Sequence, residues 1–259
     1  MKPSLAKAAT ETAPQAGPFP TAPFNMQFGT RPLVIHGHGH HPNKPAWDEF
    51  TAWYGRQPRA SLPAPERVTL ITCNNGHPAM GLFERSCDHL DLAVLRGGEG
   101  REPWDNARDK PQVILDLLDQ VTTPYVLYAD SRDAIIVGDP ERLVDDLIAH
   151  FPADAFIFGG DRMNWPPIRE FKRHEDTLAG ASASDYRYLN GGLWIAHVET
   201  AKRIFHTSST RPGHPEAPSS EQGILKQLLL EGDFNIHIDY ACRMFQNLGF
   251  AKPGTLVFR

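Results

Sequence analysis

Two aspartates three residues apart, Asp130 and Asp133, directly follow the apolar run Tyr125–Ala129. Ligands of open α/β sheets bind beyond the carboxyl ends of the strands, so a strand here would bring both carboxylates to that edge. Two carboxylates aimed at one point repel each other, and a hard divalent cation such as Mn²⁺ or Mg²⁺ relieves the repulsion. The pair therefore predicts a metal site. The competing interpretation is a turn in which Asp130 only accepts hydrogen bonds from backbone amides.

The segment from His36 to His41 holds four histidines and two glycines. Imidazole binds borderline transition metals, and glycine permits backbone conformations closed to other residues. Three interpretations stay open. The segment could form its own His-x-His zinc site, typical of a zinc hydrolase, or His36 alone could complete the Asp130/Asp133 site. It could also be a surface loop that collects metal without function.

Four further features carry weaker signals. Lys110 lies at an expected helix start and could meet a phosphate, although a single lysine is usually a solvated charge. Trp104 follows a glycine-rich loop and could stack on a flat ring or pack on the surface. Asn190-Gly191-Gly192 would admit a ligand close to the backbone or make a tight turn. Cys73 has no base placed by the sequence to activate it, so we expect a packing role.

Composition and charge exclude several functions. The chain has 259 residues with 26 basic and 31 acidic side chains, a formal net charge of −5, so a nucleic-acid partner is not expected. No apolar run approaches the roughly 20 residues that span a bilayer. The first residues lack the apolar stretch of a secretory signal, so we expect a cytoplasmic protein. The three cysteines are widely spaced, as is typical of reduced thiols.

The distribution of proline divides the chain. Residues 1–31 carry five prolines without apolar periodicity and are expected to form a disordered leader. We expect a single domain over 32–259, made of a His/Gly and aromatic segment at 32–54, a proline-rich linker at 55–66 and a main α/β body at 67–259.

From Arg67 onward, short apolar runs alternate with amphipathic segments, which indicates an α/β fold with a mostly parallel sheet flanked by helices. Asp109 and Asp139 are expected to cap helices, and the prolines that follow them, Pro111 and Pro140, are typical of helix starts. Ser219 or Ser220 could cap another helix. The expected strands are Leu33–Ile35, Val68–Thr72, Leu92–Leu95, Tyr125–Ala129, Ala155–Phe158, Leu193–Ala196, Ile236–Ile238 and Leu256–Phe258.

Several motifs together resemble the glycosyltransferase domain of the procollagen lysyl hydroxylases and related collagen glycosyltransferases. They cover most of residues 67–250 in a common order. The similar segments are Tyr125–Asp133 continued by Gly138–Leu143, Tyr188–Ile195, Ser220-Glu221-Gln222, Ile238-Asp239-Tyr240 and Cys242–Leu248.

One motif is displaced. The family's His-Gly-Asn-Gly motif follows the segment matched by Cys242–Leu248, whereas its counterpart here, His36–Gly39, lies near the N-terminus. This order suggests a circular permutation, which is physically permissible because domain termini often lie close together. The resemblance therefore implies that His36 lies beside Asp130 and Asp133.

The resemblance implies a GT-A-like fold and a metal-dependent glycosyltransferase that transfers a hexose, glucose or galactose, from a UDP-sugar to an unknown hydroxyl acceptor, a glycan, peptide or small molecule. Glu221 replaces an aspartate of the family motif, and Arg132 replaces an aromatic residue. The roles implied are metal binding by His36, Asp130 and Asp133, donor contacts by Asn74, Trp104, Lys110, Asp130 and Arg132, and sugar or acceptor contacts by Asp161, Asn190, Glu221 and Gln222.

Two other functions compete with this one. A zinc-dependent hydrolase would use the His36–His41 cluster, and a non-catalytic module would bind a nucleotide sugar without turnover.

Overall fold

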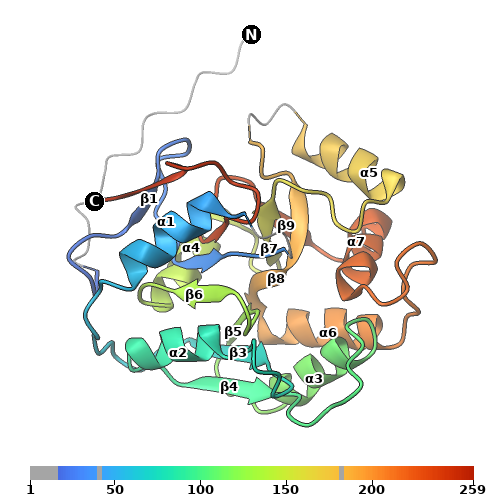
Figure 1. Cartoon of the computed structure of the whole chain (residues 1–259). Coiled ribbons are helices and arrows are strands. Elements are labelled where there is room, and N and C mark those ends of the chain that lie inside the picture. Colours follow the sequence, from blue (N-terminus) through green and yellow to red (C-terminus); the bar gives the residue numbers. More distant parts are fainter. Residues whose placement is uncertain (1–16, 40–42, 181–183) are drawn as a thin grey trace.

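The computed structural model describes residues 17–39, 43–180 and 184–259. Its centre is a six-stranded sheet in the order β4-β3-β5-β8-β7-β9 (Figure 1). The only strand of this sheet that runs antiparallel to its neighbours is β8, which pairs with β5 and β7. The strands are β3 (Val68–Cys73), β4 (Val94–Gly97), β5 (Tyr125–Ala129), β7 (Phe156–Asp161), β8 (Tyr188–His197) and β9 (Ile236–Asp239).

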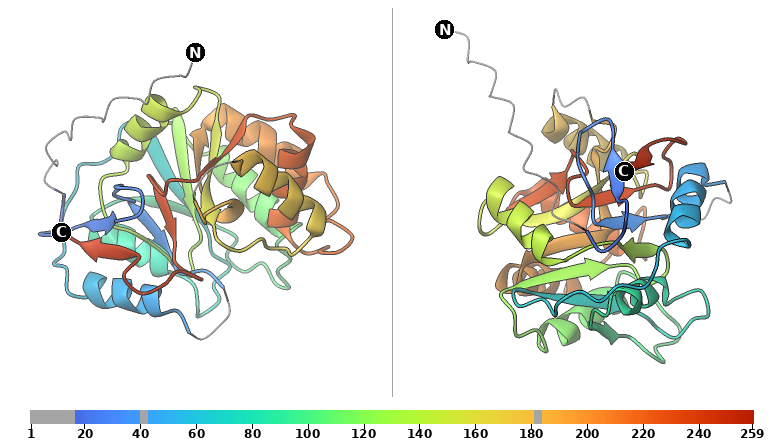
Figure 2. Two further views of the ribbon diagram at one scale, coloured as in Figure 1. Left: turned by 90° about the horizontal axis from the view of Figure 1, so that it is seen from above. Right: turned by 90° about the vertical axis from the view of Figure 1, so that its left-hand side faces the viewer.

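Apolar side chains alternate between the two faces of the sheet, as the strand period requires. On β5, Val126 and Tyr128 belong to the apolar cluster that includes helices α3, α6 and α7, whereas Leu127 and Ala129 belong to the cluster on the opposite face. Figure 2 shows helices on both sides of the sheet. The helices are α1 (Pro45–Tyr54), α2 (Leu82–His89), α3 (Asp109–Leu118), α4 (Glu141–His150), α5 (Arg169–Ala179), α6 (Val198–Ser209) and α7 (Glu221–Glu231). The expected α/β class with a mostly parallel sheet is confirmed.

A second sheet brings the N-terminal histidines to the main body. Strand β2 (Val34–His36) lies between β10 (Phe245–Asn247) and β6 (Ala134–Ile136), parallel to β10 and antiparallel to β6. His36 is paired with Asn247 on one side and Ala134 on the other. Because β6 begins directly after Asp133, this register places His36 next to the aspartate pair.

The expected disordered leader is wrong for residues 17–31. Strand β1 (Pro23–Asn25) pairs antiparallel with β11 (Leu256–Phe258), and the side chains of Phe19 and Asn25 are buried. The Asn25 amide donates to Gln246 Oε1 at 2.7 Å. The proline-rich segment is ordered because the C-terminal strand provides the partner that its own composition lacks. Residues 1–16 of the expected leader lie outside the described part.

Local details of two expected elements differ from the structure. Helix α3 begins at Asp109 itself, which is therefore inside the helix and not its cap. Asn190-Gly191-Gly192 lies within the long strand β8, and the turn interpretation is wrong. By contrast, Ser220 accepts a hydrogen bond from Gly223 N at the start of α7, as predicted. No helix within the described ranges is long and apolar enough to cross a membrane.

Candidate functional site

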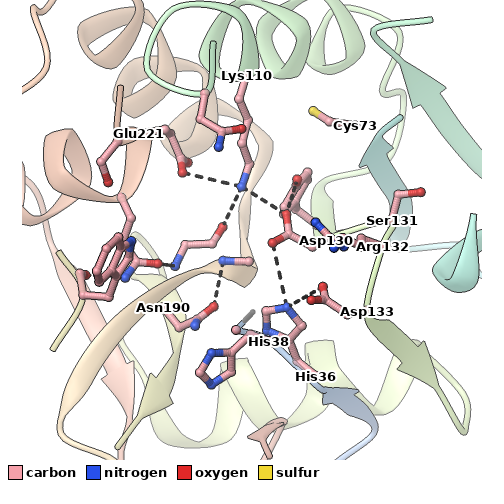
Figure 3. A pocket seen from close by; sticks show the side chains of 18 of the residues that line it. His36, His38, Cys73, Lys110, Asp130, Ser131, Arg132, Asp133, Asn190 and Glu221 are labelled. Carbon is pink, nitrogen blue, oxygen red and sulfur yellow. Dashed lines mark hydrogen bonds and ion pairs between the residues drawn. The ribbon is translucent and has the colours of Figure 1, made fainter. Parts of the chain in front are cut away.

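A cavity of about 640 Å³ opens where the carboxyl ends of β3 and β5 meet the middle of β8 and the start of α7 (Figure 3). All the sequence-predicted site residues except Asn74 line it: His36, Trp104, Lys110, Asp130, Arg132, Asp133, Asp161, Asn190, Glu221 and Gln222.

His36, Asp130 and Asp133 form a three-residue cluster at one wall of the cavity. One ligand atom from each side chain lies within 4.8 Å of the other two. His36 Nε2 is 3.0 Å from Asp133 Oδ1 and 3.8 Å from Asp130 Oδ2. His36 precedes the aspartates by 94 positions or more in the sequence. The predicted proximity of His36 to both aspartates is confirmed.

Asn247 determines which nitrogen of His36 faces the cluster. The Asn247 amide nitrogen donates to Gly160 O at 2.7 Å, so its oxygen is the atom that lies 2.8 Å from His36 Nδ1. An amide oxygen only accepts hydrogen bonds, so Nδ1 carries a proton. In the neutral ring, Nε2 then presents its lone pair to the two carboxylates.

Charge at the cluster depends on these contacts. Burial opposes the charge of His36, but Asp133 and Asp130 outweigh it and raise the pKa of His36 above its ordinary value. Burial also opposes the charge of Asp133, but His36, His38 and Lys44 lower the pKa of Asp133 to about 2. The cluster therefore holds a positive charge between two carboxylates, either as a proton on His36 or as a bound cation.

Glycine at position 192 is required by the close approach of the cluster to β8. A Cβ atom there would lie 2.5 Å from His36 Cε1 and 2.6 Å from Asp130 Oδ2. Any side chain would displace two of the three candidate ligands.

Lys110 connects Asp130 to Glu221. Its ammonium donates to Asp130 Oδ1 at 3.1 Å and lies 3.5 Å from Glu221 Oε2. The Tyr128 hydroxyl donates to the same Asp130 oxygen at 2.7 Å. Asp130 Oδ1 is thus occupied by two donors, and Oδ2 is the oxygen that faces His36.

Glu221 is a buried carboxylate with spare hydrogen-bonding capacity. Only 3% of the residue is exposed, and Oε1 has no hydrogen-bond partner among the described residues. Burial and the nearby Asp130 charge, partly offset by Lys110, raise the pKa of Glu221 to about 7. A buried carboxyl oxygen of this kind is a candidate acceptor for a ligand hydroxyl.

Asp161 and Asn190 form a second polar group in the cavity. The Asn190 amide donates to Asp161 Oδ2 at 2.9 Å, and Asn190 Oδ1 accepts from Gly192 N at 2.9 Å. His38 Nε2 lies 3.2 Å from Asp161 Oδ2. Burial opposes the charge of Asp161, but His38 and these hydrogen bonds lower its pKa.

The two described histidines of the His36–His41 run therefore face different acids, His36 toward Asp133 and His38 toward Asp161. His40 and His41 lie outside the described residues. This arrangement favours His36 as a supplementary ligand of the aspartate pair over a self-contained His-x-His site.

Gln222 uses both ends of its amide within the protein. Its oxygen accepts from Gly191 N at 2.7 Å, and its nitrogen donates to Trp165 O at 2.5 Å. The side chain thus links β8 to the loop after β7.

The expected nucleoside contacts are only partly brought together. Trp104 lines the cavity, and Arg132 is exposed at its rim. Asn74 does not line the cavity, because its amide donates to Glu84 Oε1 at 2.7 Å; its neighbour Asn75 lines it instead. Cys73 also lines the cavity, but burial raises the pKa of its thiol to about 12, which fits the expected packing role.

Several residues that hold the candidate ligands in place were not predicted from the sequence. Glu84 accepts from the Ser131 hydroxyl, and Leu82 N donates to Ser131 O, so the start of α2 fixes the turn between the two aspartates. Asn247 and Tyr128 orient His36 and Asp130. Asn247 lies in a motif that the resemblance includes, but neither its partner nor that of Tyr128 can be deduced from sequence spacing.

No family model matches the chain, and no curated protein matches it. Among solved structures, it is similar to a glycosyltransferase involved in the glycosylation of the major capsid of PBCV-1, at 12% identity and a TM-score of 0.41, over 66% of this chain and 80% of that one. It is also similar to glucosyl-3-phosphoglycerate synthase from Mycobacterium tuberculosis, solved with Mn²⁺, UDP-glucose and glycerol 3-phosphate, at 13% identity and a TM-score of 0.41, over 84% and 78% of the two chains.

A third similar structure is the glycosyltransferase GlyE of Streptococcus pneumoniae, at 12% identity and a TM-score of 0.34, over 71% of this chain and 45% of that one. Every one of these TM-scores is below 0.5, so these similarities do not establish a function.

Proposed function

We propose that the protein is a metal-dependent glycosyltransferase that moves a hexose, glucose or galactose, from a UDP-sugar to a hydroxyl group of an acceptor. One observation carries the proposal. A three-residue cation site and a buried carboxylate with an unpaired oxygen face one cavity, with a buried lysine between them.

The donor atoms of His36, Asp130 and Asp133 suit Mn²⁺ or Mg²⁺. One imidazole nitrogen and two carboxylate oxygens are a donor set that Mn²⁺ accepts, and Mg²⁺ favours the oxygens. Nε2 of neutral His36 and Oδ1 of Asp133 are two acceptors 3.0 Å apart, an arrangement that needs a positive charge between them. When bound, the ion supplies Lewis-acid stabilisation of the negative charge on the departing diphosphate.

Lys110 orients the Asp130 carboxylate and partly neutralises the negative charge of Asp130 and Glu221. Its ammonium is buried and makes contacts with Asp130, Glu221 and the carbonyl of Gly191. These contacts support a role in fixing the Asp130 carboxylate. The positive charge of Lys110 would also reduce the electrostatic repulsion between a bound diphosphate and the two acids.

Glu221, Asp161 and Asn190 are proposed to contact the transferred sugar or the acceptor. Glu221 lines the cavity, and its Oε1 has no hydrogen-bond donor among the described residues, so this carboxylate has acceptor capacity left for a sugar hydroxyl. Gln222 is proposed to act through its neighbours, since both ends of its amide are already occupied. Trp104 and Arg132 are proposed for the nucleoside, and Asn75 replaces Asn74 there because it lines the cavity.

In the transfer, the acceptor oxygen forms a bond to the anomeric carbon as the bond between that carbon and the phosphate oxygen breaks. UDP leaves with the bonding electrons, and the hydroxyl proton is released with it. The chain's residues orient the two reactants and surround the departing charge with fixed dipoles.

The closer kinship with the collagen glycosyltransferases and the circular permutation stay hypotheses. The position of His36 beside the aspartates agrees with them, as does the pairing of β1 with β11, which brings residue 22 to the C-terminal Arg259.

Calorimetry with UDP and Mn²⁺, followed by assays of sugar release from UDP-glucose and UDP-galactose, tests the function. Asp130→Asn and Asp133→Asn should remove both metal-dependent binding and turnover, while exposed Asp233→Asn serves as the matched control. Binding without sugar release to water or to any hydroxyl acceptor would favour the non-catalytic module. Zinc binding that survives both substitutions would favour the hydrolase.

A further inference from the structure

Trp165 is a large aromatic side chain that remains 54% exposed although it lines the cavity. It lies in the segment from 162 to 168 between β7 and α5, called here the Trp165 loop. An indole that lines the cavity and stays more than half exposed can pack against the apolar face of a ligand.

The order of strands in the sheet assigns this loop to one end of the cavity. Asn75 and Trp104, the proposed nucleoside side, follow β3 and β4, and the aspartate pair follows β5. Strand β8 comes next, and the Trp165 loop follows β7 beyond it. A sugar donor that reaches from nucleoside to diphosphate along this order presents its anomeric carbon toward β8 and β7, so the acceptor must enter beside Trp165.

Two residues of α7 fix the Trp165 loop. Gln222 Nε2 donates to Trp165 O at 2.5 Å, and one turn later Lys226 Nζ donates to Asn164 Oδ1 at 2.8 Å. Asn164 in turn donates to Ile168 O at 3.1 Å, which closes the loop on itself.

Lys226 is part of a fully buried ion pair. Its side chain is 0% exposed and that of Glu175 is 1% exposed, with Nζ and Oε2 2.7 Å apart. Glu175 Oε1 also accepts from Leu189 N at 2.7 Å, so the pair connects α5, α7 and β8. Buried ion pairs contribute little net stability, because desolvation offsets the attraction. The Lys226–Glu175 pair is therefore better explained by its role in holding the Trp165 loop than by a contribution to stability.

The charges around the cavity indicate what kind of acceptor fits. Among the described residues, the lysine and arginine side chains that line the cavity are Lys110, which lies between Asp130 and Glu221, and Arg132, which follows Asp130 in the chain. Near the end of β7 the lining polar groups are Asp161, Asn190 of β8 and His38, whose Nε2 lies 3.2 Å from Asp161 Oδ2. These groups suit hydroxyls and lie on the same side of β8 as the indole. Arg162 of the Trp165 loop pairs with Asp185 at 3.0 Å and does not line the cavity. Within the described ranges, a phosphate or carboxylate would therefore find no lysine or arginine on this side of the cavity.

From these observations, and resting on the proposed function, we propose that the acceptor is a neutral saccharide whose pyranose ring stacks on Trp165, and that Lys226 is the positioning residue that holds this wall through Asn164. A pyranose has the required chemistry, since it presents a C–H face to the indole and hydroxyls to the polar groups.

The test uses the full chain with UDP-glucose or UDP-galactose, Mn²⁺ and defined probes. These are the methyl pyranosides of glucose, galactose, mannose and xylose, compared with glycerol 3-phosphate and free glycerol. We expect at least one methyl pyranoside to accept the sugar with a kcat/KM at least tenfold above that of glycerol 3-phosphate. Preference for glycerol 3-phosphate, or no pyranoside acting while metal-dependent donor hydrolysis persists, would overturn this proposal and leave the proposed function standing.

Substitutions of Trp165 test whether the acceptor ring stacks on the indole, apart from any effect on the stability of the protein. Trp165→Ala should raise the pyranoside KM at least fivefold, and Trp165→Phe should restore part of the loss. Ile148→Ala, which removes another exposed apolar side chain outside the cavity, should change nothing. An unchanged KM in Trp165→Ala would contradict the stacking.

Two variants test whether Lys226 positions the Trp165 loop: Asn164→Leu and the double variant Lys226→Met/Glu175→Met. The double variant removes both charges of the ion pair, so it leaves no unpaired charge buried in the protein. Both should raise the acceptor KM severalfold, while kcat for donor hydrolysis and the affinity for UDP and Mn²⁺ stay within twofold of the unmodified chain. A double variant that folds and keeps its acceptor KM would show that the pair does not position the loop.

Discussion

Asn247 Oδ1 lies 2.8 Å from His36 Nδ1, on the side of the ring opposite to the aspartates. This contact fixes the imidazole so that Nε2 faces Asp133, and Asn247 is itself held by Gly160 O. The site therefore depends on a residue of β10 that never touches the proposed ion.

Asn247→Leu tests this outer contact. Loss of the acceptor leaves the His36 tautomer and ring angle unfixed, and such second contacts are worth about 10- to 100-fold in metal affinity. We expect the Kd for Mn²⁺ measured by calorimetry to rise within that range. Gln246→Leu, at the next position of β10, controls for general damage to the strand, and equal effects of the two substitutions would contradict the assignment.

Gly192→Ala should weaken metal binding without unfolding the protein. The new Cβ would lie 2.5 Å from His36 Cε1 and 2.6 Å from Asp130 Oδ2, so both ligands must move. Gly17→Ala is the matched control, since nothing lies within 4 Å of a Cβ at that position. Circular dichroism should show a native spectrum for both variants, and Mn²⁺ affinity should fall more than about tenfold in Gly192→Ala alone. Unchanged affinity there would show that the cluster is not the metal site.

Metal binding should weaken in acid because a proton competes for His36. Asp133 and Asp130 outweigh burial and raise the pKa of His36, so the ring is protonated below that raised value and a metal must displace the proton. We expect Mn²⁺ affinity to be flat in alkaline solution and to fall about tenfold per pH unit below the pKa of His36. Calorimetry in buffers of different ionisation enthalpy counts the protons released. Absence of proton release at pH 6 would contradict a role for His36 as ligand.

Glu221→Gln should alter the pH dependence of stability in the metal-free protein. The pKa of Glu221 is raised from 4.5 to about 7, chiefly by burial, so its contribution to stability is fully present below pH 4.5 and is lost as the pH rises through about 7. Glutamine carries no charge and escapes this loss. We expect the variant to be more stable than the unmodified chain at pH 8.5, by on the order of 2 kcal/mol, and of similar stability near pH 5.

Urea unfolding at the two pH values measures the difference, and Asp161→Asn provides the contrast. The pKa of Asp161 is lowered, because His38 and hydrogen bonds outweigh burial, so its substitution should destabilise at pH 8.5. Equal behaviour of the two variants would contradict the environments described for these acids.

The sequence was sufficient for the parts of the site that depend on local pattern. Asp130 and Asp133 could be placed because an apolar strand precedes them, and Ser220 could be placed because it caps the helix that carries Glu221. His36 needed the resemblance to a family, since its contact with Asp133 results from the pairing of β2 with β6, and no local pattern predicts that pairing.

The remaining differences have physical causes in tertiary structure. Residues 17–31 are proline-rich, yet β11 and Gln246 provide partners for β1 and Asn25. Asn74 directly follows β3, as a ligand-binding residue at the carboxyl end of a strand would. Its amide donates to Glu84 instead of facing the cavity, and the sequence spacing does not predict this hydrogen bond.

The most direct test of the central claim is an anomalous-scattering map, recorded at the manganese edge, from crystals grown with UDP and Mn²⁺. We expect one strong peak between His36 Nε2, Asp130 Oδ2 and Asp133 Oδ1, with the diphosphate beside it. UDP bound in the cavity with no anomalous peak at these three atoms would contradict it.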